Sequence, residues 1–532
     1  MTRVDFFHRE GKMIKFTTAK KMSLATVMAT VLTASLTANA GEYLIKYKNE
    51  KAVNNMISME SVNSGLEVRS MHRPGKLVKV NVAEKNRARI LASILSDKNV
   101  EYAVPNFKLK AFSAPIEANA LKEQYALAKV NAEQAWKRAG NKGSKNVLLA
   151  VIDTGVDYKH KNLITNMVSG YDFRDNDADP MDITSQQNPG HGTHCAGIIG
   201  ANGVVDGGIQ GISPELSIMP LRFLGADGSG ELEGGIKAID YAIANKVQVI
   251  SASWGATVPL ATAKPLVEAI ERAEKAGIIF VAAAANDGKN NDKTSVYPAN
   301  AGTPNMISVA ASNSSDTKPS WSNYGKATVS IAAPGDAIMS TLPGDKYGNL
   351  SGTSMATPLV AGMVAFLKAQ DPSLTGAEIR SLLQTTGAKV QIETACNCRV
   401  DAFAAVDTLL SQKSWIVPAA ATVAVDATQQ FSLKNAKGAV KFETSDANIA
   451  TINEQGVLTG KAQGVVTVRA LDSADNSVTS SLDINIGKAQ STQPPDDGGG
   501  MPGMPGDGEC PLGDAQLCQI ICQIAPQMPW CQ

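Results

Sequence analysis

Two histidines and a cysteine lie within five positions in the segment HGTHCAG, residues 191–197. Imidazole and thiol groups this close together can bind a metal ion, and an imidazole can also act as a general base. The segment lacks the H-E-x-x-H spacing of zinc peptidases, and no acidic residue stands between the two histidines. A zinc hydrolase that uses His191, His194 and Cys195 is therefore one hypothesis, and a site with a histidine base is the other.

Three more segments contain possible partners for a histidine base. Asp153 follows the apolar run NVLLAVI, so its carboxylate would emerge at a strand end, where it can orient an imidazole. Ser354 opens the apolar stretch GTSMATPLVAGMVAFLK, which predicts a helix with Pro358 in its first turn. The positive end of a helix favours a nucleophile that generates an oxyanion. Asn286, in FVAAAANDG, has a side-chain amide that can donate to that negative charge.

The elements that must position these groups follow an α/β pattern. Between residues 121 and 410, short apolar runs such as NVLLAVID, VQVISAS and IIFVAAAA alternate with amphipathic helical stretches. This pattern predicts a parallel sheet covered by helices on both faces, with the site at the carboxyl ends of the strands. Residues 41–111 suit a small α+β module before it. Period-two alternation predicts a small β-sandwich over 415–487.

Both ends of the chain have distinctive compositions. Residues 1–40 contain lysines, then the run LATVMATVLTASLTA, then ANA, as in an export signal, and predict a secreted protein. A membrane anchor is the alternative, but the run is rich in Thr and Ala and shorter than about 18 residues. Residues 488–509 form a Pro/Gly linker. The tail, 510–532, holds four of the seven cysteines, and so short a segment needs disulfides to be stable.

The charge balance gives no indication of a charged partner. Lys plus Arg and Asp plus Glu number 50 each, so there is no excess that would favour nucleic acid or an anionic membrane. We also expect no membrane span, because no segment after residue 40 is apolar enough to cross a bilayer. The odd number of cysteines leaves at least one thiol free or paired between chains.

Taken together, the motifs resemble those of subtilisin-like serine peptidases, or subtilases, over about residues 124–410. The matching segments are VIDTGVD, HGTHCAG, AAAAND and SGTSMATPLVAG. FLGADGSGELEGGI (223–236) and SASWGA (251–256) resemble the substrate-binding segments of the family, and Leu232 and Trp254 in them are expected near the substrate strand.

The resemblance implies a monomeric serine endopeptidase that hydrolyses protein or peptide substrates through an acyl-enzyme, with no redox or organic cofactor. Ser354 would attack the scissile carbonyl, and His191 would take its proton and pass it to the leaving amine. Asp153 would hold the imidazole tautomer, while Asn286 and the backbone N–H of Ser354 would bind the oxyanion. Asp287 is predicted to favour a basic residue at the cleavage point.

The family also suggests roles for the flanking regions. Residues 41–111 resemble an inhibitory propeptide whose end, VEYAVPNFKLKA, occupies the cleft and is cut off between about 111 and 121. Residues 415–487 resemble a bacterial immunoglobulin-like domain. In the proteinase K branch a free cysteine lies beneath the catalytic histidine, so Cys195 is expected to be reduced and buried, and His194 to pack in the core.

The segment GYDFRDNDADPMD resembles a calcium loop of some thermostable subtilases. Oxygen ligands at alternate positions suit calcium, although a solvated acidic turn is the alternative. The candidate ligands are Asp172, Asp175, Asp177, Asp179 and Asp182. The family's other common calcium site uses an aspartate where this chain has Asn162.

Two further functions compete with the serine peptidase. DTG also occurs in aspartic peptidases, which need two facing aspartates, but the chain has no second DTG or DSG. A catalytically silent surface-binding protein is the other alternative, and the intact set Asp153, His191, Asn286 and Ser354 argues against it.

Overall fold

The computed structural model describes residues 41–54, 65–113, 124–487, 512, 514–526 and 528–531. The predicted export signal, 1–40, and the predicted linker, 488–509, lie outside these residues. The residues described belong to a single compact unit of the chain.

A nine-stranded sheet forms the centre of the largest part of the fold. Its order is β18-β19-β15-β14-β12-β10-β6-β8-β7, and its paired strands are parallel except β18 with β19. The strands are β6 (Leu148–Asp153), β7 (Tyr171–Asp172), β8 (Ser217–Arg222), β10 (Val249–Ala252), β12 (Ile279–Ala283), β14 (Met306–Ser312), β15 (Ile331–Pro334), β18 (Ala388–Lys389) and β19 (Cys398–Arg399). The central strands are buried on both faces, which explains why they read as continuous apolar runs.

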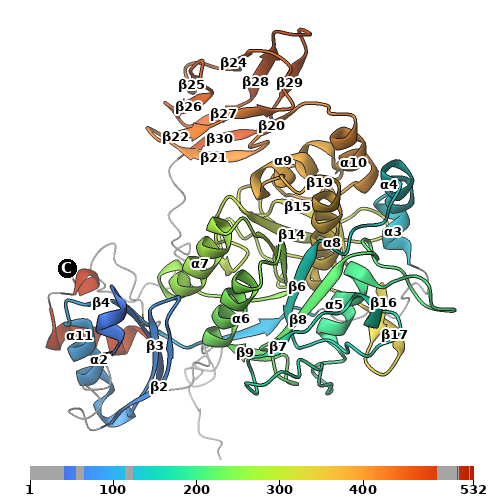
Figure 1. Cartoon of the computed structure of the whole chain (residues 1–532). Coiled ribbons are helices and arrows are strands. Elements are labelled where there is room, and N and C mark those ends of the chain that lie inside the picture. Colours follow the sequence, from blue (N-terminus) through green and yellow to red (C-terminus); the bar gives the residue numbers. More distant parts are fainter. Residues whose placement is uncertain are drawn as a thin grey trace, which may run out of the picture. The chain divides into compact units, whose positions relative to one another are not determined.

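Helices cover both faces of this sheet, as the sequence predicts (Figure 1). Alternate residues of β12 show the two faces. Ile279 and Val281 belong to the apolar cluster that contains α5 (His191–Gly200) and α8 (Thr353–Gln370). Phe280 and Ala282 belong to the cluster that contains α6 (Leu232–Ala244) and α7 (Leu260–Lys275). The remaining elements of this region are α3 (Tyr125–Lys129), α4 (Ala132–Ala139), β13 (Val296–Tyr297), β16 (Ile338–Leu342), β17 (Lys346–Leu350), α9 (Gly376–Thr386) and α10 (Ala402–Leu410).

The N-terminal module is a four-stranded antiparallel sheet with one face on the large region. Its strands, in the order β2-β3-β1-β4, are β1 (Glu42–Tyr47), β2 (Leu66–His72), β3 (Leu77–Val82) and β4 (Val100–Pro105). Leu44 joins the cluster of α6 and α7, whereas Tyr43 and Ile45 face α2 (Arg87–Leu95) of the module itself. The next strand, β5 (Lys108–Ala111), pairs with β9 (Ser229–Glu231) and β11 (Trp254–Thr257) of the large region.

Short strands make up the region after residue 414, in agreement with the predicted all-β module. They form four small sheets around an apolar core that includes Phe431, Leu458 and Ile484. The strands are β20 (Trp415–Val417), β21 (Ala421–Ala424), β22 (Thr428–Gln430), β23 (Ser432–Lys434), β24 (Val440–Thr444), β25 (Ala450–Ile452), β26 (Val457–Gly460), β27 (Gly464–Val466), β28 (Val468–Asp472), β29 (Val478–Ser480) and β30 (Ile484–Gly487). The tail contains α11 (Ala515–Ile524). Among the described residues, no helix has the length and apolar character needed to span a membrane.

Candidate active site

Asp153 and His191 form a buried pair at the carboxyl edge of the sheet. Asp153 is the last residue of β6, and His191 is the first residue of α5. His191 Nδ1 lies 2.7 Å from Asp153 Oδ1, and the two side chains are 2% and 1% exposed. Burial by itself lowers the pKa of the imidazole, but the Asp153 carboxylate outweighs it, so the pKa of His191 is raised. The pair is therefore built to hold and stabilise a proton on the imidazole.

The start of α5 fixes the position of the imidazole. Asn188 Oδ1 accepts hydrogen bonds from the backbone N–H groups of Gly190 (3.0 Å) and His191 (2.8 Å). Gly190 has a φ of 110°, and a Cβ at this position would lie 2.1 Å from Pro343 Cδ. Only glycine fits this turn without strain. These contacts thus fix the backbone from which the His191 side chain extends.

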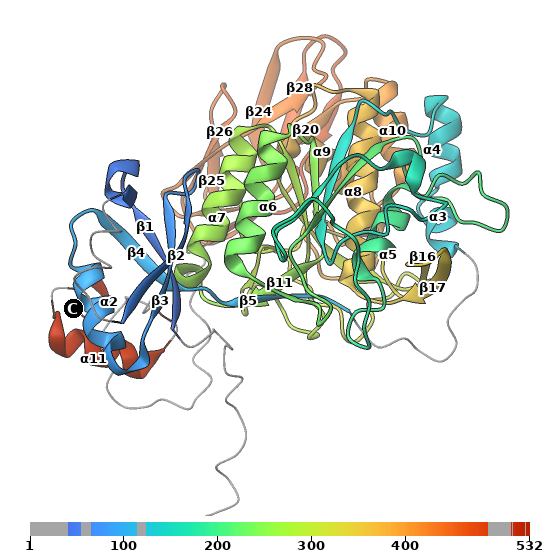
Figure 2. The same ribbon diagram turned by 60° about the horizontal axis from the view of Figure 1, so that its bottom comes forward.

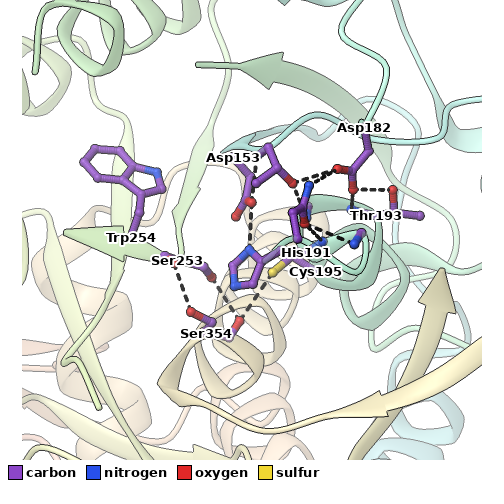
Figure 3. A network of polar contacts seen from close by, with 12 residues as sticks. Asp153, Asp182, His191, Thr193, Cys195, Ser253, Trp254 and Ser354 are labelled. Carbon is purple, nitrogen blue, oxygen red and sulfur yellow. Dashed lines mark hydrogen bonds and ion pairs between the residues drawn. The ribbon is translucent and has the colours of Figure 1, made fainter. Parts of the chain in front are cut away.

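Asp182 is a second buried carboxylate behind the pair (Figure 3). Its Oδ1 accepts from Thr154 Oγ1 and Asn188 Nδ2, both at 2.9 Å. Its Oδ2 accepts from Thr193 N at 3.0 Å and Thr193 Oγ1 at 2.7 Å. Thr154 Oγ1 in turn accepts from the backbone N–H of Gly192 at 2.9 Å. Asp182 therefore ties the residue after Asp153 to the first turn of the histidine helix.

Ser354 lies at the start of α8, and its hydroxyl bonds Ser253 (Figure 3). Its Oγ donates to the backbone oxygen of Ser253 at 2.9 Å. Within the described part of the chain, the buried His191 Nε2 has no hydrogen-bond partner. To donate to this nitrogen the hydroxyl must give up its bond to Ser253 O, and catalytic hydrogen bonds often form only with substrate in place.

Pro358 lies inside α8 rather than in its first turn, so the predicted position is wrong. The helix already begins at Thr353. Proline has no N–H to bond the carbonyl four residues earlier, which is that of Ser354. This oxygen instead accepts from Ser253 Oγ at 3.0 Å and from Cys195 Sγ at 3.4 Å. Ser253 and Cys195 thus satisfy the carbonyl that the proline leaves free.

Asn286 presents an unpaired amide next to Ser354. Its Oδ1 accepts from both Thr353 N and Thr353 Oγ1 at 2.9 Å, which directs the NH₂ group the other way. Among the described residues, Asn286 Nδ2 has no partner, although it is buried. A Cβ built on Gly352 would lie 3.0 Å from this nitrogen, 3.4 Å from Ser354 N and 2.6 Å from Phe112 O. The N–H donors Asn286 Nδ2 and Ser354 N and the Phe112 carbonyl oxygen therefore surround the same point beside Gly352.

The Phe112 carbonyl lies one residue beyond β5, the strand that follows the N-terminal module. β5 lies antiparallel between β9 and β11, which belong to the two segments expected to bind substrate. Just beyond it, Phe112 N donates to Ser253 O at 3.1 Å, the same oxygen that accepts from Ser354 Oγ. The ring of Phe112 packs over Gly255, where an added Cβ would come within 2.8 Å of Cζ. Residues 108–112 thus run between the two segments expected to bind substrate and end beside Ser253.

The metal-binding hypothesis for His191, His194 and Cys195 finds no support in the geometry. In the described residues, the group with metal-ligand spacing is Asp153, His191 and Cys195, without His194. The His194 ring is buried, bonds Gly348 O at 3.0 Å through Nε2, and has its pKa lowered to about 3 by burial. His194 is a core histidine, as expected. Cys195 is fully buried and, of the described cysteines, the one without a disulfide.

Comparison with known proteins identifies the family. A model described as the subtilase family matches residues 144–400, and one for a bacterial Ig-like domain (group 2) matches 410–481. The thermophilic serine proteinase of Bacillus sp. (strain AK1) is 38% identical over 313 residues, covering 59% of this chain and 74% of the relative. Thermitase of Thermoactinomyces vulgaris is 40% identical over 267 residues, or 50% and 89% of the two chains. The chain belongs to the subtilase family. It is a subtilisin-like serine peptidase with an Ig-like C-terminal domain.

The predicted calcium loop of this subtilase divides into two sets of aspartates. Asp175, Asp177 and Asp179 are exposed, whereas Asp172 and Asp182 are buried. Arg222 forms ion pairs with Asp172 and, at 2.6 Å, with Asp175. Asp182 holds the histidine helix, as described above. The exposed carboxylates at alternate positions are thus the ones with room for an ion.

Sequence reasoning missed Ser253, Asn188 and the buried role of Asp182. Ser253 stands in the motif SASWGA. Its hydroxyl donates to the Ser354 carbonyl and its carbonyl accepts from the Ser354 hydroxyl, and no local sequence pattern indicates these two bonds. Asn188 lies in the turn before α5, where an asparagine side chain often accepts backbone N–H groups two and three residues later, and this pattern could have indicated its role. Leu232 and Trp254 flank β5 as expected: Leu232 N donates to Phe107 O at 3.0 Å, and Trp254 pairs with Ala111.

Proposed function

We propose that the chain is a secreted serine endopeptidase that cleaves proteins through an acyl-enzyme. The observation that carries the proposal is the convergence of Asn286 Nδ2, Ser354 N and a peptide carbonyl beside the Asp153–His191 pair. Secretion is proposed from residues 1–40, which have the composition of an export signal.

The proposed reaction uses each group in turn. Ser354 Oγ attacks the scissile carbonyl and transfers its proton to His191 Nε2. Asp153 stabilises the imidazolium at Nδ1, and Asn286 Nδ2 and Ser354 N bind the oxyanion. His191 then protonates the leaving amine, which leaves an acyl group on Ser354. A water molecule, deprotonated by His191, hydrolyses this ester and restores the enzyme.

Casein hydrolysis by purified protein tests the proposal. Ser354→Ala should lower the rate about a millionfold, the loss known for subtilisin when its triad serine is removed. Ser373→Ala, an exposed serine in the turn after α8, is the matched control and should keep the wild-type rate. Activity that survives Ser354→Ala but is lost with a zinc chelator would favour the metal hypothesis. No hydrolysis by any variant would favour a silent binding protein.

We further propose that residues 41–112 are an inhibitory propeptide cut between Phe112 and Ser113. The position of the Phe112 carbonyl beside Asn286 Nδ2 supports this bond, as does the Phe112 ring over Gly255. The ring supports a pocket for large apolar side chains, rather than the basic preference predicted from Asp287. N-terminal sequencing of the active enzyme should read Ser113 first. Fully active protein that still begins near Gly41 would contradict the proposal.

Polar contacts between the module and the α6–α7 face support inhibition. Lys46 Nζ pairs with Glu268 at 2.7 Å, and His72 Nε2 with Asp240 at 2.6 Å. These pairs and the apolar contacts of Leu44 would keep the module bound after cleavage. The enzyme should therefore show a lag before it hydrolyses casein, and the lag should lengthen with protein concentration if released module rebinds.

A structural calcium ion at Asp175, Asp177 and Asp179 is also proposed. Their exposure and alternate spacing support it, while Arg222 pairs with the buried Asp172 and with Oδ2 of Asp175. A chelator should lower the thermal stability of the wild type, and Asp177→Ala should abolish this effect. A chelator effect that persists in Asp177→Ala would place the ion elsewhere.

A further inference from the structure

The tail packs against the N-terminal module, although more than 400 residues separate them in the sequence. Views from two directions place α11 beside α2 (Figures 1 and 2). Leu517, Cys518 and Ile521 of α11 are buried, and with Leu512, Ala525 and Met528 they join the apolar cluster of the module. This cluster lies on the face of the four-stranded sheet opposite the face that contacts α6 and α7.

Helix α2 shows the effect of a second covering element. A helix that packs only on a sheet buries one stripe about 100° wide. In α2, Ile90, Leu91, Ala92 and Ile94 are all at most 3% exposed, and these positions span about twice that arc at 100° per residue. Helix α11 contacts α2 and shares its apolar cluster, so α11 covers part of this wide arc.

Polar contacts and disulfides fix the tail in this position. Asp514 caps α11 by accepting from Leu517 N at 3.0 Å, and it also pairs with Arg87 of α2 at 3.3 Å. A disulfide joins Cys522 to Cys531, and Cys518 is disulfide-bonded as well. Cross-links let so short a segment hold a helix without a core of its own. The apolar face of α11 is thus preformed and completed by the module.

We propose that the cysteine-rich tail is a clamp that retains the propeptide after it has been cut. The idea rests on the proposed cleavage at Phe112–Ser113. Cleavage separates the propeptide covalently from the enzyme, but the tail remains joined to the enzyme through the Ig-like domain. A tethered contact acts at a high effective concentration and slows dissociation of the bound fragment. The propeptide is then held on both faces, by α6 and α7 on one and by α11 on the other.

Two adjacent isoleucines of α11, one buried and one exposed, allow a matched test. Ile521 is fully buried against the module, and Ile520 is 46% exposed. In the full-length chain, size-exclusion chromatography after self-cleavage measures how fast the propeptide leaves the enzyme. Ile521→Asp should shorten the half-time of release about tenfold or more, because a buried Ile contributes that much or more to a contact. Ile520→Asp should leave it unchanged. Equal half-times for the two variants would overturn the proposal.

A second measurement separates this proposal from that of cleavage. In chains that carry Ser354→Ala and cannot cut themselves, hydrogen exchange reports how firmly β1 is held. Adding Ile521→Asp should raise exchange of the β1 amides about tenfold, and adding Ile520→Asp should not. Unchanged exchange would refute the clamp whether or not the wild type is cut. A chain that ends at Gly487 provides a variant without any tail, and it should behave as Ile521→Asp does in both assays.

Discussion

Replacement of Asp182 by alanine should destabilise the protein and slow catalysis, although Asp182 touches no reacting atom. Four donor groups would lose their acceptor: Thr154 Oγ1, Asn188 Nδ2, and both N and Oγ1 of Thr193. The threonine hydroxyls can turn toward other acceptors, and Asn188 Nδ2 keeps its bond to Ile183 O at 3.0 Å. The backbone N–H of Thr193 cannot turn in this way, so it would be left without an acceptor.

The size of the effect follows from these contacts. A buried donor left without a partner costs about 1–3 kcal/mol, and each weakened hydrogen bond costs about 1 kcal/mol. The buried carboxylate itself opposes folding, since burial raises the pKa of Asp182 while its hydrogen bonds lower it. The net loss in free energy of unfolding should be about 3 kcal/mol. Because the same bonds hold the turn at His191, kcat should fall as well, by up to about a hundredfold.

Urea unfolding of chains that also carry Ser354→Ala measures the stability without self-digestion. Asp206→Ala is the control, because Asp206 is exposed and is not one of the proposed calcium ligands. It should cost less than about 0.5 kcal/mol. The kcat of each single variant is then measured with Ser354 intact. The account of Asp182 is wrong if Asp182→Ala costs no more stability than Asp206→Ala and leaves kcat unchanged.

Three other predictions concern the reacting groups. Asn286→Ala should lower kcat about 10²- to 10³-fold, the range measured for the corresponding donor of subtilisin, with little change in KM; an unchanged kcat would exclude it from the oxyanion site. His191 acts as a base only when neutral, and its pKa is raised above the ordinary value of 6.5, so kcat/KM should fall as the pH drops through a midpoint above 6.5. Asp153→Asn should move this midpoint down, and a midpoint below 6 in the wild type would contradict the geometry of the pair. Mercurials should inhibit through Cys195, slowly because burial raises the pKa of its thiol; equal inhibition of Cys195→Ala would locate their target elsewhere.

The sequence was sufficient to predict the layers of the fold, whereas the four groups of the site stay a prediction. Buried parallel strands read as short apolar runs, and the amphipathic helices between them show their own period. Asp153 ends such a run and Ser354 opens an apolar helix, so both fall at element ends that a parallel sheet gathers at one edge. These signals are local, which is why they can be read from the chain directly.

Other features depend on contacts between distant segments and could not be predicted. The sequence does not distinguish the five aspartates of this short segment from one another. In the structure Asp182 accepts hydrogen bonds from Thr154 and Thr193, and Asp172 forms an ion pair with Arg222. The cysteine content of the tail predicted disulfides, yet nothing in it indicates that α11 would pack on α2. Proline favours the first turn of a helix, which is why the sequence predicts Pro358 there. In the structure Pro358 lies further inside α8, and the Ser354 carbonyl that it cannot bond accepts from Ser253 and Cys195 instead.

The most direct test of the central claim is to locate the nucleophile in the active enzyme. A fluorophosphonate reacts with an activated serine, and mass spectrometry of the digested protein identifies the labelled residue. We predict one adduct per chain, on Ser354, with casein hydrolysis lost in proportion to the fraction labelled. Full hydrolysis after complete labelling of Ser354, or an adduct on another residue that accounts for the loss, would contradict the account.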